Sequence, residues 1–146
     1  MAESREGVRS ASDGRESATA AHDDHERGSV LMQVSNAMVR LFKEQFGRGP
    51  TKVRSHWAAP DTLLCVLRDS FTQAEKNMVA LGEHQRLRDI RMFFQHASEQ
   101  EFRSAIEKIV GRRVESYTSA VDTKTDTSFE VFIFEPDSSA DRAAED

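Results

Sequence analysis

Two apolar patterns meet at one short junction, Phe46-Gly47-Arg48-Gly49-Pro50-Thr51-Lys52-Val53-Arg54. Before the junction the apolar residues recur with the 3.6-residue period of a helix, and after it they alternate as they do in a strand. Gly47 suits the position that follows a helix C-terminus, and Pro50 has no N–H with which to continue the helix. The junction therefore predicts a corner that sets the angle between the first helix and a sheet.

The helix before the corner is predicted over residues 29–46, with Ser29 as its N-cap. Its apolar residues fall on one stripe, as in an amphipathic helix. They are Leu31, Val34, Met38, Leu41 and Phe42.

Both ends of the chain have a composition that differs from the centre. Residues 1–28 contain Val8 as their one large aliphatic side chain, and residues 137–146 are small, polar or acidic. Such segments bury too little apolar surface to offset the entropy of ordering. We therefore predict a disordered N-terminal tail, a single domain over residues 29–136 and a disordered acidic C-terminal tail.

After the corner, the pattern predicts a strand at about 51–58, a turn at Ala59-Pro60-Asp61 and a strand at 62–68. The second strand has an uninterrupted apolar centre, Leu63-Leu64-Cys65-Val66-Leu67, which suggests burial on both faces or a central position in the sheet. The two strands should pair as a hairpin.

The spacing of Thr72 and Glu75 is that of a capping box, so a second helix should begin there and break near Gly82. A longer helix is predicted over about 83–110, ending at Gly111. Its predicted apolar side consists of Leu87, Ile90, Phe94, Phe102, Ala105, Ile106 and Ile109.

Two more strands, 114–121 and 129–134, flank a polar connection of hairpin length. The order α-β-β-α-α-β-β predicts a two-layer α+β domain, with one four-stranded, mostly antiparallel sheet and helices on a face.

Charge and cysteine content exclude several classes of protein. The tails carry a net charge of −6 and the whole chain −5, so the central domain is nearly neutral at +1, which argues against a strongly basic nucleic-acid module. The single cysteine, Cys65, permits no intrachain disulfide and indicates a cytoplasmic protein. The longest apolar run has five residues, against the roughly 18 that suggest a membrane span.

Several segments, taken in order, resemble the MpsC-like family, a domain of unknown function. They are residues 35–44, the Gly47-Arg48-Gly49-Pro50-Thr51-Lys52 loop, residues 63–67, 71–75 and 111–114, and the closing segment 129–136. The resemblance covers about residues 30–136. This chain departs from it at His56-Trp57, where the family commonly has small or aliphatic residues.

The family name refers to a sodium-translocating system that generates membrane potential. The resemblance therefore implies a small accessory or regulatory protein without enzymatic activity or a cofactor, and a protein partner that includes membrane cation-translocating subunits.

The loop also permits a second interpretation, as a site for an anion, a nucleotide, a nucleic acid or another acidic partner. Its candidate residues are Arg40, Lys43, Arg48, Lys52 and Arg54. The glycines permit close backbone approach, but the loop follows a helix and lacks the spacing of a Walker A motif. We favour the interpretation in which Gly47, Gly49 and Pro50 form a structural turn and the charges are solvated.

Other candidate sites are weaker. His84 and His96 have no histidine at i, i+4 spacing, so we predict no metal site. Cys65 has the apolar surroundings of a core thiol, and no catalytic set is visible. The basic run Arg86, Arg88 and Arg91 is diluted by acidic residues, and nucleic-acid binding is not expected. A sheet with helices on one face leaves a face or an edge to cover, and so suggests a homodimer.

Overall fold

A computed structural model describes residues 13–136, and describes their side chains from residue 23. Four helices and four strands follow in the order α1 (Asp13–Phe46), β1 (Lys52–Ala59), β2 (Thr62–Arg68), α2 (Gln73–Ala80), α3 (His84–Ala97), α4 (Glu99–Val110), β3 (Val114–Asp122) and β4 (Thr127–Phe134). The predicted α+β class and element order are confirmed, with the long third helix divided into α3 and α4.

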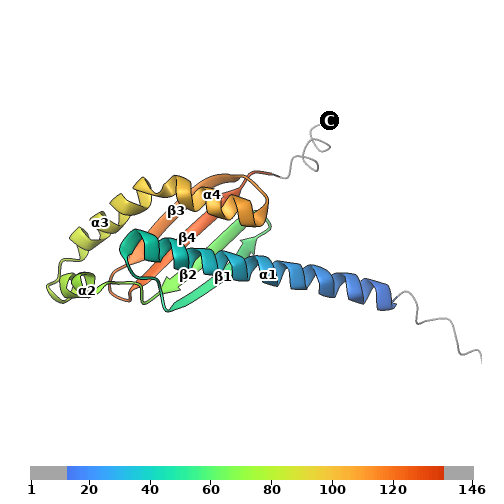
Figure 1. Ribbon diagram of the computed structural model, residues 1–146, viewed down its shortest axis with the longest axis horizontal. Helices are drawn as coiled ribbons and strands as arrows, with labels where there is room; N and C mark the ends of the chain where they lie inside the picture. Colours follow the sequence, from blue (N-terminus) through green and yellow to red (C-terminus); the bar gives the residue numbers. More distant parts are fainter. Residues whose placement is uncertain (1–12, 137–146) are drawn as a thin grey trace, which may run out of the picture.

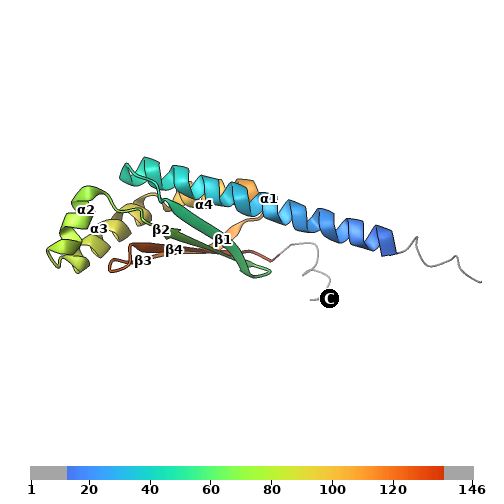
Figure 2. The ribbon, with the colours of Figure 1, turned by 90° about the horizontal axis from the view of Figure 1, so that it is seen from below.

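The sheet has the strand order β1-β2-β4-β3, and every neighbouring pair is antiparallel. Helices α1, α3 and α4 lie on one side of it and α2 lies past its end, as the two views show (Figure 1, Figure 2), and the opposite side carries no helix. The strand order places β2 in the interior of the sheet, as predicted. Its side chains, however, alternate between buried and half-buried. Burial on both faces is therefore wrong, because only one face is covered.

The hydrophobic core lies between the sheet and the paired helices α1 and α4. Its largest buried side chains include Met38, Phe42, Phe102, Phe132 and Phe134. The predicted stripe of the first helix supplies Val34, Met38, Leu41 and Phe42 to this core, with Leu31 packed against it. The amphipathic pattern thus correctly identified the buried face of α1.

The beginning of α1 differs from the prediction. The helix starts at Asp13, so residues 13–28 are helical and not disordered, and Ser29 lies inside the helix. Residues 23–29 are exposed, and the extension runs past the end of the sheet (Figure 1). Residues 13–28 mix good helix formers such as Ala, Glu and Arg with weak ones such as Asp, Ser and Gly. Residues 1–12 and 137–146, where we also predicted disorder, lie outside the described residues.

The capping box at Thr72 and Glu75 is present, with Glu75 N–H donating to Thr72 Oγ1 and Thr72 N–H to Glu75 Oε1. Gly111 ends α4 in the left-handed conformation, with φ 78°. The break between α3 and α4 at Ser98 was missed, since no Gly or Pro marks it.

The predicted apolar side of the third helix is right for Leu87 in α3 but wrong for Ile90 and Phe94. Ile90 and Phe94 are 43% and 40% exposed, whereas Leu87, Arg91 and Gln95 are buried. Two of the three buried positions in α3 are polar, which apolar periodicity cannot detect.

Candidate functional site

The corner after α1 is a tight structural turn. Gly47 has φ 81° and donates its N–H to Lys43 O at 2.9 Å, which closes the helix. A Cβ on Gly49 would lie 3.0 Å from Val39 O and 3.2 Å from Val39 Cγ1, so a side chain there would crowd Val39. Pro50 is buried. Gly47, Gly49 and Pro50 lie between the end of α1 and the start of β1.

Arg48 is committed to contacts within the chain. Its Nη1 donates to Phe71 O at 2.7 Å, and its Nη2 lies 3.0 Å from Asp69 Oδ2. Hydrogen bonds from Thr51 and then Arg48 lower the pKa of Asp69, an exposed carboxylate. Arg48 therefore ties the corner to the connection between β2 and α2.

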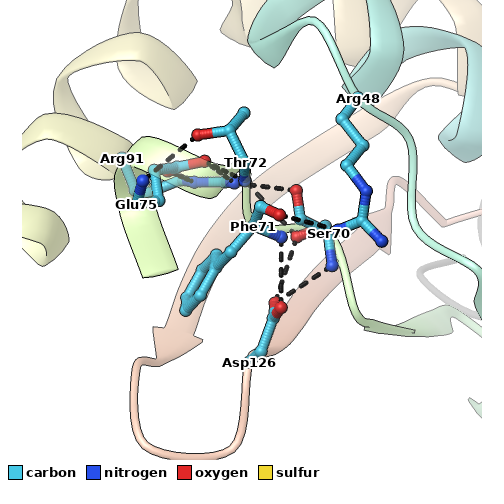
Figure 3. A network of polar contacts seen from close by, with 7 residues as sticks. All are labelled: Arg48, Ser70, Phe71, Thr72, Glu75, Arg91 and Asp126. Atoms are coloured by element: carbon cyan, nitrogen blue, oxygen red, sulfur yellow. Dashed lines mark hydrogen bonds and ion pairs between the residues drawn. The ribbon is translucent and has the colours of Figure 1, made fainter. Parts of the chain in front are cut away.

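That connection is also held from two other sides (Figure 3). The carboxylate of Asp126, in the β3–β4 hairpin, accepts the N–H groups of Ser70 and Phe71 at 3.0 and 3.1 Å. From α3, Arg91 pairs with Glu75 and donates to Ser70 O at 3.2 Å. The three contacts join segments that are distant in sequence, so this cluster stabilises the fold.

The other predicted cations are dispersed. Arg40 and Lys43 lie exposed on α1, where Arg40 faces Glu44 at 4.0 Å. Lys52 and Arg54 lie on β1, on the side of the sheet that the helices leave open. The structure brings only these last two together, and it adds His56 and Arg68 around a shallow cavity of about 380 Å³.

The uncovered face of the sheet combines this basic edge with an apolar centre. The alternation of β2 and β4 puts five apolar side chains on it: Leu64, Val66, Phe129, Val131 and Ile133. Register pairs Leu64 with Val131 and Val66 with Phe129, so the patch is continuous across two strands. Within residues 23–136, no ion pair engages Lys52, Arg54 or Arg68. We call these apolar and basic residues the open face.

The covered side of the sheet contains an unexpected polar row. Register aligns Ser55 of β1, Cys65 of β2, Glu130 of β4 and Ser119 of β3 across all four strands. Apolar residues from the same strands occupy the next row, which contains Trp57, Leu63, Phe132 and Tyr117. A polar row inside a hydrophobic layer is costly unless its groups are hydrogen-bonded.

Glu130 is the centre of this row and is fully buried. Its Oε1 accepts Gln95 Nε2 and Ser119 Oγ, both at 2.7 Å, and its Oε2 accepts the Tyr117 hydroxyl at 2.5 Å. Burial raises the pKa of Glu130 to about 8, against the opposing effect of these hydrogen bonds. No cation lies within ion-pair distance of it in the described chain.

Cys65 is buried beside Glu130, and Ser55 Oγ lies 3.5 Å from its sulfur. Burial raises the pKa of the Cys65 thiol to about 12. A thiol with this pKa holds its proton at neutral pH and is a poor nucleophile. This agrees with the core role that its apolar surroundings predicted.

The histidines do not converge. His84 Nδ1 lies 2.6 Å from Thr123 Oγ1, and His56 and His96 lie on different elements. Within the part of the chain that the structure describes, no group of three His, Cys, Asp or Glu residues could hold a metal ion.

Sequence reasoning missed Gln95, Arg91 and Glu130 as buried polar residues. The one available signal was alternation in β4, which puts Glu130 on the same face as Phe132 and Phe134. Both faces of that strand carry apolar residues, so alternation alone could not identify the buried face.

Comparison with protein families supports the predicted resemblance. Residues 26–136 match the model of MpsC, described as a Na+-translocating membrane potential-generating system. The chain belongs to the MpsC family. Neither a curated protein nor a solved structure matches it. Over the described residues, the MpsC chain has no helix that is both long and apolar enough to span a bilayer.

Proposed function

We propose that this MpsC-family chain is a non-enzymatic, cytoplasmic accessory domain that binds membrane subunits of a Na+-translocating system through its open face. The choice of partner rests on family membership, since the family description names Na+ translocation and membrane potential. The choice of binding surface rests on the open face, which is the observation that carries the proposal.

Two properties of the open face favour a protein partner. Side chains such as Phe129, which is 37% exposed, form part of a continuous apolar patch on the side of the sheet that no helix covers. Contiguous exposed apolar surface with a polar rim is typical of interaction sites. Lys52, Arg54 and Arg68 at its edge would complement acidic groups on the partner and set the orientation of docking.

The test is co-purification of the tagged full chain with solubilised membranes. We expect Val131→Asp and the double variant Lys52→Glu/Arg54→Glu to abolish recovery of cation-translocating subunits. Arg40→Glu, a matched charge reversal on exposed α1, should leave recovery unchanged. Wild-type protein that recovers no transport subunit, or open-face variants that recover them normally, would refute the proposal.

A second candidate function is anion or nucleotide binding, and the basic cavity favours it. The cavity of about 380 Å³ is surrounded by Lys52, Arg54, His56 and Arg68. Within residues 23–136, none of its lysine and arginine side chains forms an ion pair. Arg48 would not take part, because Asp69 and Phe71 O engage it. Thermal-shift assays with phosphate and nucleotides should show stabilisation that Arg54→Ala removes. If Arg54→Ala were stabilised by these ligands as much as wild type is, this cavity would not be the binding site.

The predicted homodimer would use the same face, since two copies could each cover the apolar patch of the other. Analytical ultracentrifugation at micromolar concentration would then show a dimer that Val131→Asp converts to monomer. A wild-type monomer under these conditions would leave the open face to the membrane subunits.

A further inference from the structure

A cavity of about 650 Å³ lies between α3 and the edge strand β3, on the opposite side of the sheet from the open face. Gln95, Tyr117 and Ser119 all line it, and these are the three residues that hold Glu130. We call it the α3–β3 cavity. Its inner end is therefore built on a fully buried carboxyl group.

The polar groups at this inner end have acceptor capacity that the chain does not use. Gln95 is 4% exposed, and its Oε1 has no hydrogen-bond partner within residues 23–136. The Tyr117 and Ser119 hydroxyls donate to Glu130, so each oxygen keeps lone pairs with which to accept. A buried carbonyl without a donor is costly, and a ligand with N–H groups would satisfy it.

The charge of the lining selects the sign of the ligand. Asp89 and Glu99 lie in the lining and Glu130 behind it, whereas none of the lining residues is Lys or Arg and the one lining histidine is His96. Arg103 pairs with Glu99 at 3.6 Å, so Asp89 and Glu130 are the carboxyl groups without an ion pair in the described chain. Phe93, 70% exposed, offers an aromatic surface at the same cavity. Carboxylates, uncharged oxygen acceptors and an aromatic ring together favour a cation over an anion.

The size and apolar part of the cavity favour an organic cation over a bare ion. Its volume falls in the range of small-molecule pockets, roughly 300–1,000 Å³. Met92, Phe93 and Ala97 supply apolar lining against which an alkyl chain could pack. A primary ammonium has three donors, which matches the three acceptors.

We propose that the α3–β3 cavity binds a primary ammonium group on a short alkyl chain, with Gln95, Tyr117 and Ser119 accepting its N–H bonds and Glu130 supplying the counter-charge. The ammonium could belong to a free alkylamine or to a lysine side chain. This site is independent of the proposed open-face docking, because the two lie on opposite sides of the sheet.

Binding should tighten with pH, because Glu130 must ionise to attract the cation. With a pKa of about 8, its ionised fraction rises about tenfold between pH 7 and 9. The groups that face it do not titrate there, since Arg91 stays charged and the pKa values of Tyr117 and Cys65 are raised, the latter to about 12. The interval from pH 7 to 9 also lies above the ordinary pKa of an imidazole side chain.

Isothermal titration calorimetry of the full chain with butylammonium chloride tests the proposal at constant ionic strength. We expect saturable binding that is about tenfold tighter at pH 9 than at pH 7. Tetramethylammonium, which has no N–H donor, and sodium chloride should bind at least tenfold more weakly. Nα-acetyl-lysine amide distinguishes the sources, since tighter binding than butylammonium indicates a lysine side chain and weaker binding a free amine.

Variants locate the site. Glu130→Gln should lose both affinity and pH dependence, whereas Gln95→Met should lose about tenfold in affinity and keep the pH dependence. Arg54→Ala, on the open face, is the matched control and should bind normally. If circular dichroism shows that Glu130→Gln does not fold, Gln95→Met and the wild-type pH dependence decide. Absence of saturable binding at pH 9, equal binding of sodium, or unchanged affinity in folded Gln95→Met would overturn the proposal.

Discussion

Two buried ionisable side chains, Arg91 and Glu130, have opposite surroundings. Arg91 is 2% exposed, pairs with Glu75 and lies 3.8 Å from the centre of the Phe46 ring. Glu130 is fully buried and accepts three hydrogen bonds, but has no ion-pair partner in the described chain. The charge of Arg91 is neutralised by Glu75 within the fold, whereas Glu130 has no such counter-ion in the described chain.

The difference separates a structural cluster from a titratable one. Arg91 keeps its charge because a guanidinium is not deprotonated in proteins, so its partner must be provided. Glu130 can take up a proton, and burial raises its pKa to about 8. The fold therefore tolerates Glu130 without a counter-ion at neutral pH, and leaves it free to respond to a ligand or to pH.

The largest expected effect comes from breaking the paired cluster. Arg91→Met leaves the Glu75 carboxylate without its partner beside a buried site, and should lower the free energy of unfolding by about 3–5 kcal/mol. Urea unfolding followed by circular dichroism measures the loss. A loss below about 1 kcal/mol would show that the pair contributes little net stability.

The unpaired charge should show itself in the pH dependence of stability. The pKa of Glu130 is raised from 4.5 to about 8 in the folded chain, so the folded state holds a proton that the unfolded state has released. Its stabilising contribution is complete below pH 4.5 and is lost as pH rises toward 8.

Glu130→Gln removes this titration. Between pH 5 and pH 7, the free energy of unfolding of the variant should gain about 2–3 kcal/mol relative to wild type. Urea unfolding of both proteins at pH 5, 7 and 9 gives this difference directly, and other titrating groups cancel. A difference that stays constant with pH would mean that the pKa of Glu130 is the same in the folded and unfolded states.

An intermediate effect is expected at Asp126, which supports the paired cluster from the β3–β4 hairpin. Its carboxylate accepts two backbone N–H groups, and its own φ is 51°, a conformation that alanine adopts poorly. Asp126→Ala should lower the free energy of unfolding by about 2–3 kcal/mol. Asp126→Asn, which keeps one acceptor and the local preference, should lose less. Equal losses in the two variants would argue against the hydrogen bonds as the cause.

The sequence was sufficient for most of the fold because local chemistry and apolar period agreed along it. The ends of helices are marked by residues whose backbone preferences depend little on tertiary context, namely Gly47, Pro50 and the Thr72–Glu75 capping box. The start of α1 was not predictable from burial, because residues 23–29 are helical while exposed. Local propensity gives no signal there either, since most of these residues are weak helix formers: Asp23, Asp24, His25, Gly28 and Ser29.

The candidate sites were harder to predict because they depend on pairing between distant strands. Ser55, Cys65, Glu130 and Ser119 come into one row only through the register of three strand pairs. Arg91 falls within a basic run that has the appearance of a solvated face, and its burial follows from how α3 packs on its neighbours. The loop cations were visible in the sequence, yet most of them are dispersed or paired.

The smallest effect should come from an exposed counterpart of the paired cluster, Arg86 and Glu83 at the start of α3. Their side chains are 77% and 45% exposed and 3.4 Å apart. Arg86→Met should change the free energy of unfolding by no more than about 0.5 kcal/mol, because solvent screens exposed pairs. The same substitution is thus compared at two positions on one helix, by urea unfolding at one pH. Similar losses in the free energy of unfolding for Arg86→Met and Arg91→Met would mean that burial does not explain the contribution of Arg91. The contrast between the paired Arg91 and the unpaired Glu130 would then lose its physical basis.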